Sequence, residues 1–233
     1  MISKLGVLLR RSLDILRTEG LGPLFRRCID FISPWFFKRE DYYIYEHEIL
    51  KTGKEADFLP KLTDFTFKII SSNREADELA SLVGFDFRKH FVKTREMLNQ
   101  GAIAFCVFVG NELVHIGWVA MDEKAKKAVD AVPYKVSFSK GQACTGRTWT
   151  LPQYRGKGLM AYSYFKRFQF LRDKGFTTSR NAVSKSNIAS QKAHAKFGPK
   201  VVAEARLMEL LSLRFYSEKQ PDMAERDNRP SGN

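Results

Sequence analysis

Residues 151–158 of the chain, LPQYRGKG, have the composition of an anion-binding turn. Gly156 and Gly158 allow backbone conformations that other residues avoid, and apolar residues at helical spacing follow from Leu159. A helix that begins at Leu159 leaves its first backbone N–H groups without intrahelical partners, and its dipole favours negative charge there. Residues 143–151 (ACTGRTWTL) precede this turn and predict a strand. A strand, a glycine turn and a helix in this order can cradle a phosphate group.

Two common nucleotide-binding patterns do not fit this turn. A P-loop has a glycine five residues before its Gly-Lys pair and Ser or Thr after the lysine, whereas Leu151 and Gly158 occupy these positions. A dinucleotide-binding fingerprint requires three glycines in its own spacing, and only two are present. Residues 151–200 contain eleven Lys and Arg against Asp173 alone, a net charge of 11 − 1 = +10 within a chain of +13. A phosphorylated ligand explains this excess, although a solvated helix face also carries lysines.

Two motifs together carry a family resemblance. The segment from Gln153 to Gly158 resembles the Q/R-x-x-G-x-G/A acyl-CoA loop of the GNAT superfamily of N-acyltransferases. Residues 187–198 are similar to the N-x-x-A-x-x-x-Y-x-x-x-G segment that follows in that family. This second match has two departures, since Ser190 stands for Ala and His194 for Tyr. The resemblance covers about residues 65–213 and makes nucleic acid an unlikely partner, because the aromatic residues of this span follow helical core spacing.

The resemblance implies an α/β (α+β) fold with a mixed, mostly antiparallel central sheet, helices on both faces and an N-terminal helical extension. Strands are predicted at 41–50, 65–70, 102–109, 113–121, 143–151, 176–183 and 199–213, and helices at 73–84, 86–101, 159–174 and 187–198. Residues 124–127 are predicted as a basic loop and 134–138 as an additional strand or an insertion. A GNAT sheet splays between its fourth and fifth strands, which here are 143–151 and 176–183.

The resemblance also implies a set of residues that contact acyl-CoA. The backbone of Arg155 to Leu159 would hold the pyrophosphate, and Asn187 would bind the pantetheine arm. The full set is Thr148, Trp149, Thr150, Gln153, Arg155, Gly156, Lys157, Gly158, Leu159 and Asn187. His194 would lie near the sulfur as the proton donor, which requires a raised pKa or only partial occupancy of the protonated form; the alternative is a helix-surface histidine.

Amide formation from a thioester requires a neutral amine, so a base must remove a proton. Glu46, His47, Glu48, His115 and Asp122 are candidate bases, and no spacing selects one of them. The leading hypothesis is direct acetyl transfer from acetyl-CoA to a primary amine of a small molecule, such as an amino sugar or an amino acid. Two alternatives remain open: a protein or peptide N-acetyltransferase, and a non-catalytic CoA-binding module.

The chain is predicted to divide into a basic amphipathic extension (1–60), a GNAT-like acyltransferase domain (61–216) and a disordered tail (217–233). Residues 1–40 combine apolar and basic side chains and are expected to contact the domain, a partner subunit or a membrane surface. The three cysteines form no CxxC motif or Cys/His cluster, so neither a disulfide framework nor a metal site is predicted. These features favour a cytoplasmic protein, with peripheral membrane contact as an open alternative.

Overall fold

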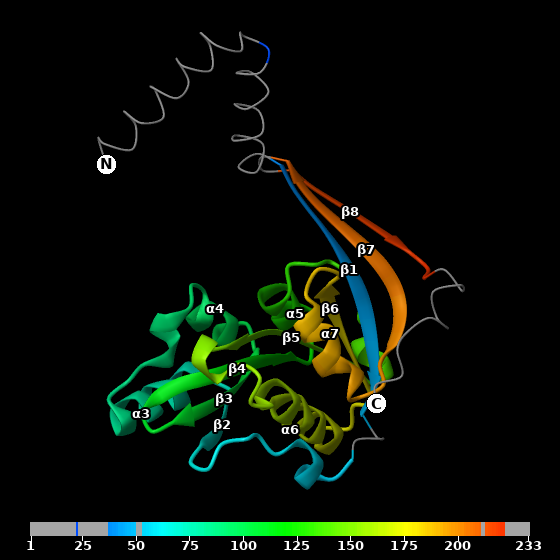
Figure 1. The fold of residues 1–233 in the computed structure, drawn as a ribbon. Helices are drawn as coiled ribbons and strands as arrows, with labels where there is room; N and C mark the ends of the chain where they lie inside the picture. Colours follow the sequence, from blue (N-terminus) through cyan, green and yellow to red (C-terminus); the bar gives the residue numbers. More distant parts are fainter. Residues whose placement is uncertain (1–21, 23–36, 50–52, 211–212, 222–233) are drawn as a thin grey trace. The chain divides into compact units, whose positions relative to one another are not determined.

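The computed structural model describes Gly22 and residues 37–49, 53–210 and 213–221 (Figure 1). The helices predicted within residues 1–36 lie outside these residues, and the membrane or partner contact of residues 1–40 stays a prediction. One compact unit comprises Asp41–Ala205 with the segment from Ser217, and the other comprises Met1–Glu40 with Arg206–Tyr216. The candidate site lies in the first unit. No helix of the described residues is long and apolar enough to cross a membrane.

Eight strands form one sheet in the order β2-β3-β4-β5-β6-β1-β7-β8 (Figure 1). The strands are β1 (Phe37–Glu48), β2 (Thr66–Ile70), β3 (Ile103–Val109), β4 (Glu112–Ala120), β5 (Gln142–Thr150), β6 (Thr178–Ser184), β7 (Lys200–Leu210) and β8 (Leu213–Lys219). Strands β2 to β5 pair antiparallel, β5 and β6 pair parallel, and β6 pairs antiparallel with β1. The predicted mixed, mostly antiparallel sheet is therefore confirmed.

Helices cover both faces of this sheet. The α-helices are α3 (Asn73–Val83), α4 (Thr94–Asn99), α5 (Glu123–Val129), α6 (Leu159–Asp173) and α7 (Ile188–Ala195). A Cβ placed on Gly117 of β4 would meet Arg167 of α6. A Cβ on Gly146 of β5, the register partner of Trp118, would instead meet the end of α5 at Val129 and Asp130. Because neighbouring residues of a strand face opposite sides, α5 and α6 lie on opposite faces.

The parallel β5–β6 ladder is short and ends inside β5. It contains the pairs Gln142 with Thr178, Ala143 with Ser179 and Cys144 with Arg180. Beyond Cys144, β5 keeps its pairing with β4 but shifts register, and Arg147 takes the left-handed φ of 44°. Such a bulge bends and twists its strand. The splay predicted between 143–151 and 176–183 is thus the place where β5 and β6 stop pairing.

Four local predictions need correction or extension. Residues 124–127 belong to helix α5 rather than a loop, because the Asp122 side chain caps it by accepting a hydrogen bond from Ala125 N at 2.8 Å. Residues 134–138 form no strand; Tyr134 is buried, and the 3-10 helix η4 (Phe138–Lys140) follows. The sequence predicts Asn73 as the cap of α3, whereas the structure has Ser72 there, with its side chain accepting a hydrogen bond from Glu75 N. Strand β8 continues to Lys219, and residues 222–233 lie outside those described.

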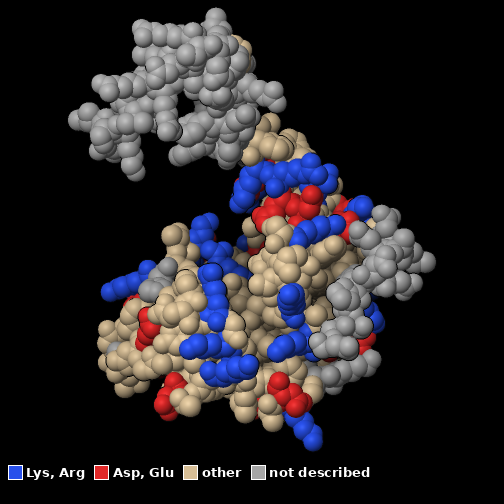
Figure 2. Space-filling model, in the orientation of Figure 1, with Lys and Arg blue, Asp and Glu red and all other residues tan. Residues whose placement is uncertain are grey.

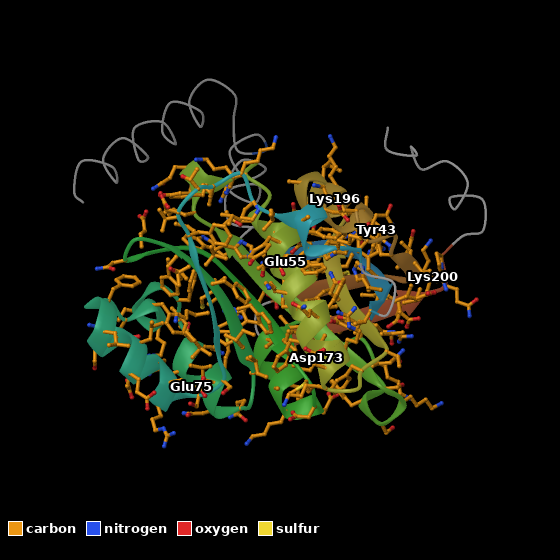
Figure 3. All side chains as sticks on the ribbon, turned by 90° about the horizontal axis from the view of Figure 1, so that it is seen from below. Tyr43, Glu55, Glu75, Asp173, Lys196 and Lys200 are labelled. Carbon is orange, nitrogen blue, oxygen red and sulfur yellow. The ribbon has the colours of Figure 1, made fainter. Side chains whose placement is uncertain are left out.

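Strand β1 lies within the 1–60 segment that we set apart from the acyltransferase domain. It pairs with β6 from Tyr42 opposite Ser184 to Glu48 opposite Thr178, so its residues 41–48 share the compact unit of the body. The 3-10 helix η2 (Glu55–Phe58) then packs on α6, where Glu55 (Figure 3) forms a 2.8 Å ion pair with Lys166. This unit therefore begins at Asp41.

The main core lies between α6 and the sheet. Tyr164, Phe168 and Leu171 of α6 are buried at helical spacing against Phe105 and Val119. Phe168 and Leu171 are fully buried, and burial of such side chains stabilises the fold by roughly 2 kcal/mol each. This packing fixes the position of α6 and of the turn that leads into it.

Candidate functional site

The turn between β5 and α6 has the backbone of an anion site. After the 3-10 helix η5 (Pro152–Tyr154), Gly156 and Gly158 take the left-handed φ values 77° and 83°. Helix α6 begins at Leu159 without a side-chain hydrogen bond at its N-cap, Gly158. Its first N–H groups are therefore free to bind an external acceptor. A Cβ on Gly156 would meet no atom within 4 Å, so this turn lies beside open space.

Contacts on both sides hold the turn in place. The backbone N–H of Lys61 donates to Lys157 O at 2.8 Å, and the Arg155 side chain donates to Thr150 O at 3.3 Å. Lys157 lies over the Tyr154 ring. Gln153 and Arg155 are exposed, and Figure 2 shows Lys and Arg side chains outnumbering acidic ones on the face drawn there. The turn is thus held by its neighbours in a basic environment.

The predicted pantetheine-lining residues alternate across β5. Thr148 Oγ1 accepts a hydrogen bond from Arg167 at 3.4 Å, and Thr150 Oγ1 lies 2.8 Å from His115 Nδ1. Trp149 packs edge-on against Phe91, with ring centroids 5.1 Å apart. All three follow the last β6-paired residue of β5, so this stretch has no parallel neighbour. The structure brings them next to the turn, and their contact with pantetheine stays a prediction.

Asn187 and His194 occupy the two ends of α7. Asn187 caps the helix by accepting a hydrogen bond from Ser190 N at 3.0 Å, which leaves its amide NH₂ as the group that would bind the arm. His194 is only 1% exposed, so the helix-surface alternative is wrong. The two residues lie on one short helix, but they face different surroundings.

His194 belongs to a buried hydrogen-bonded chain that sequence reasoning missed. Its Nδ1 lies 3.1 Å from His47 Nε2, and its Nε2 lies 3.2 Å from Asn181 Nδ2. Because an amide NH₂ donates, His194 carries its proton on Nδ1 and donates it to His47. The ring of Tyr164 packs edge-on against His194 at 4.5 Å. Burial lowers the pKa of His47 to about 4 and that of His194 well below its ordinary 6.5, so both are neutral at pH 7. The raised pKa that an acid role requires is therefore not present in this state.

Arg167 is a buried cation beside this chain. It is 0% exposed, donates to Ser163 O at 3.2 Å and stacks its guanidinium carbon 3.6 Å from the centre of the Tyr164 ring. Its Nη2 has no hydrogen-bond partner among the described residues. The positive charge contributes to the low pKa of both His47 and His194.

A second buried polar cluster lies on the opposite face, at the end of α5. Asp130 Oδ2 accepts a hydrogen bond from the Tyr134 hydroxyl at 3.0 Å, and that hydroxyl lies 3.2 Å from Cys144 Sγ. Burial raises the pKa of Asp130. A Cβ on Gly146, next to the β5 bulge, would lie 3.8 Å from Asp130 Oδ2. Sequence reasoning missed Asp130 because its position depends on α5, which was predicted as a loop.

The structure distinguishes the candidate bases that the sequence left equal. Glu46 pairs with Arg180 at 2.8 Å and Glu48 with Lys200 at 2.7 Å, while Asp122 caps α5. The other two, His47 and His115, are buried, and burial lowers the pKa of His115 to about 3. None of these five is a buried carboxylate beside the β5 bulge. Among the described residues, no group of three or more His, Cys, Asp or Glu side chains is arranged to hold a metal ion.

The buried histidines predict a pH dependence of stability. The unfolded chain titrates His47, His115 and His194 near pH 6.5, whereas the folded chain keeps them neutral to much lower pH. The unfolded state therefore binds more protons, and the free energy of unfolding falls as pH falls below 6.5, by about 1.4 kcal/mol per pH unit for each group. The raised pKa of Asp130 has the opposite effect on stability, because the folded state then binds this proton more readily than the unfolded state. It is one group, and the three histidines outweigh it.

Urea unfolding between pH 7 and pH 5 measures this slope, above the range where most carboxylates titrate. His115→Leu should reduce the loss between pH 6.5 and pH 5 by about 2 kcal/mol, whatever its effect on stability at pH 7. An equal stability of the wild-type chain at pH 7 and pH 5 would contradict the neutral, buried state of these rings.

Comparisons with known proteins identify no relative by sequence: no family model and no curated protein matches the chain. Among solved structures, it is similar to a GNAT-family acetyltransferase from Colwellia psychrerythraea (16% identity, TM-score 0.47, 75% of this chain and 56% of that one). It is also similar to a glucosamine N-acetyltransferase region of a fungal multi-domain GH3 beta-N-acetylglucosaminidase (11% identity, TM-score 0.48, covering 82% of this chain and 23% of that one). A third similar structure is the C-terminal domain of a proposed lysylphosphatidylglycerol synthetase from Agrobacterium fabrum (14% identity, TM-score 0.43, covering 92% of this chain and 73% of that one).

The chain spans 58% and 56% of the first two solved structures that it matches. All of these likenesses are below a TM-score of 0.5 and carry no argument about function. The chain itself displays the element order β2, α3, α4, β3, β4, β5, α6, β6, α7, β7, with α5 inserted between β4 and β5. With the parallel β5–β6 pair that splays after Cys144, this order gives the chain a GNAT-like fold.

Proposed function

We propose that the chain is an acyl-CoA-dependent N-acyltransferase that transfers an acetyl group from acetyl-CoA to a primary amine of a small molecule. An amino sugar or an amino acid is the proposed acceptor class, and the transfer is direct, within a ternary complex. One observation carries this proposal: the uncapped N-terminus of α6, opened by Gly156 and Gly158, follows directly on the part of β5 that has no β6 partner. An anion site and an unpaired strand edge at one point suit a ligand with a pyrophosphate and an amide-containing arm.

In the proposed binding mode, main-chain groups and one side chain contact different parts of the ligand. The N–H groups of residues 155–159 receive the pyrophosphate, and the main chain of Thr148 to Thr150 pairs with the pantetheine amides. The NH₂ group of Asn187 binds the arm from α7, since its oxygen already caps that helix. The Arg155 N–H already donates to Pro152 O at 3.2 Å, so the N–H groups of residues 156–159 are the better placed for the pyrophosphate. Trp149 and Thr150 pair with β4 on one side, so the arm would use the opposite edge of β5.

The proposed chemistry begins with the amine. Its nitrogen lone pair attacks the thioester carbonyl carbon, and the carbon–sulfur bond breaks to release coenzyme A. We assign the removal of the amine proton to Asp130, because burial raises the pKa of this carboxylate and it lies beside the β5 bulge. Backbone N–H groups at the bulge are suited to stabilise the tetrahedral oxyanion. Proximity of the two bound substrates supplies much of the remaining rate.

His194 is the proposed donor of a proton to the leaving sulfur, by its position on α7. Its lowered pKa requires that ligand binding restore a proton to the His47–His194 pair before it can act. The lowered pKa of His194 also favours a second candidate function, a CoA-binding module without catalysis. Turnover separates the two candidates, because both predict CoA binding.

Substitution of Gly156 tests the ligand site. Gly156→Val places a side chain at the turn and strains a left-handed residue by about 1–2 kcal/mol, so CoA affinity in calorimetry should fall about tenfold or more. Gly110→Val is the matched control, because Gly110 is also left-handed with open space around it but lies in the β3–β4 hairpin. Wild-type affinity in folded Gly156→Val would remove the basis of the proposed function.

Substitution of Asp130 tests the base. Asp130→Asn keeps an oxygen that can accept the hydrogen bond from Val132 N but removes the basic group, so kcat should fall about 10²-fold or more while CoA affinity stays unchanged. Glu123→Gln, an exposed carboxylate at the start of the same helix, is the control. Equal kcat values for the wild type and Asp130→Asn would mean that water or another group removes the amine proton.

Substitution of His194 tests the acid. His194→Ala should lower kcat by about 10²-fold and leave acetyl-CoA affinity nearly intact, and His194→Tyr should restore part of the loss. Circular dichroism of both variants checks that the buried position tolerates the change. Full turnover by His194→Ala would assign this histidine to packing alone.

A further inference from the structure

Arg167 combines deep burial with an unused hydrogen-bond donor. Its Nε and Nη1 are bound to Ser163 O and Thr148 Oγ1, and its Nη2 is without a partner among the described residues. No Asp or Glu of the described part of the chain pairs with it, although every other buried arginine there, namely Arg88, has carboxylate partners in Asp86 and Asp77. A buried cation without an anion costs several kcal/mol. A protein can keep such a destabilising residue where a bound ligand supplies the missing negative charge.

The sheet makes room for this guanidinium. A Cβ on Gly117 would lie 2.7 Å from the guanidinium carbon of Arg167, closer than any real contact, so this strand position admits only glycine while Arg167 stays in place. The Tyr164 ring closes the other side at 3.6 Å. Arginine keeps its proton in proteins, so the positive charge persists across the pH range in which the enzyme would act.

The location of this charge relates it to the proposed reaction. Thr148, which Arg167 contacts, lies on the stretch of β5 that has no β6 partner. Tyr164, on which Arg167 stacks, also contacts His194 at a centroid distance of 4.5 Å. His194 is the residue that we propose beside the sulfur of the donor. Tyr164 thus connects the guanidinium of Arg167 to the histidine that we propose beside the leaving group.

We infer that Arg167 stabilises the coenzyme A thiolate as it departs, acting as an electrostatic partner of the sulfur. This inference rests on the proposed function. As the carbon–sulfur bond breaks, both bonding electrons stay on sulfur, and the anion pairs with the guanidinium instead of requiring immediate protonation. The tetrahedral oxyanion has backbone N–H groups at the bulge available, whereas the neutral His194 provides no charge to the sulfur. Until His194 delivers the proton proposed above, the thiolate thus has no other charged partner.

The groups that face Arg167 come from every element packed against it. They are Ser163 and Tyr164 of α6, His115 of β4, Thr148 of β5, His47 of β1 and His194 of α7. The Cys144 thiol lies on the opposite face of β5 but still acts on Arg167 electrostatically. The three imidazoles have lowered pKa values and are neutral, and the buried Cys144 thiol has its pKa raised to about 12. Two ligands that differ only in the thiol experience the same protein groups, so the ratio of their affinities between pH 7 and 9.5 reports the thiol of the ligand.

Calorimetry with coenzyme A and with desulfo-coenzyme A, in which hydrogen replaces the thiol, tests this inference on the wild-type chain. If Arg167 lowers the pKa of the bound thiol by about one unit, affinity for coenzyme A should rise several-fold from pH 7 to pH 9.5, towards a limit of about tenfold. Desulfo-coenzyme A should show no such rise. The ratio of the two affinities cancels pH effects on the rest of the site.

Variants identify the residue responsible. Arg167→Met should abolish the rise in the ratio, Arg167→Lys should retain part of it, and Lys174→Met, which removes an exposed cation from the same region, should leave it unchanged. A ratio that is independent of pH in the wild type overturns the inference and leaves the proposed function standing. Failure of both ligands to bind overturns both. If Arg167→Met does not fold, the wild-type series and Arg167→Lys decide the question.

Discussion

The short parallel contact between β5 and β6 is the constraint on which the site depends. Three residue pairs join the two strands, and then the bulge at Arg147 turns β5 away while its antiparallel pairing with β4 continues. Main-chain groups of a strand interior normally satisfy one another, so a strand that loses a neighbour inside the sheet presents unused donors and acceptors. The same divergence directs the end of β5 into the glycine turn and sets the start of α6. The proposed ligand contacts of β5 and the proposed anion site thus have one structural origin.

The two faces of the sheet near this divergence differ in their electrostatics. On the α6 face, Arg167 keeps a buried positive charge, and the nearby rings of His47 and His194 are held neutral by burial. On the α5 face, the same physical effect acts on a carboxyl group and raises the pKa of Asp130. Burial therefore favours a proton acceptor on the α5 face, whereas on the α6 face Arg167 keeps its charge against the effect of burial, which lowers its pKa. An acyl group held between them would have its attacking and leaving atoms in different environments.

Much of the fold follows from local sequence signals, because each predicted element carries its own pattern. The strand, glycine turn and helix around Gly156 were predicted within a few residues, and so was the helix that Asn187 caps. Alternation and helical spacing are read within one segment, and these segments contain both their core face and their caps. The basic residues 124–127 hid helix α5, since Lys-rich helices with a small apolar face resemble polar loops.

The chemistry-bearing residues could not be predicted in the same way. His47 is brought to His194 by a strand that is separated from its β6 partner by more than 130 positions, and Arg167 resembles any helix-surface arginine in sequence. Asp130 gains its environment only when Tyr134 folds back onto it and burial removes water. Each of these properties is created by tertiary contacts, and a single sequence contains no periodic signal for them.

The state of the two described cysteines bears on how the acyl group can travel. Cys106 and Cys144 are both 0% exposed, and burial raises the pKa of each thiol, to about 12 for Cys144. Thioesters exchange their acyl groups with thiolates rather than with thiols. A cysteine that stays protonated next to the strand edge therefore does not capture the acyl group, even though Cys144 is the last β5 residue paired with β6. The two described cysteines are thus not suited to capture the acyl group, which agrees with the direct transfer to an amine that we propose.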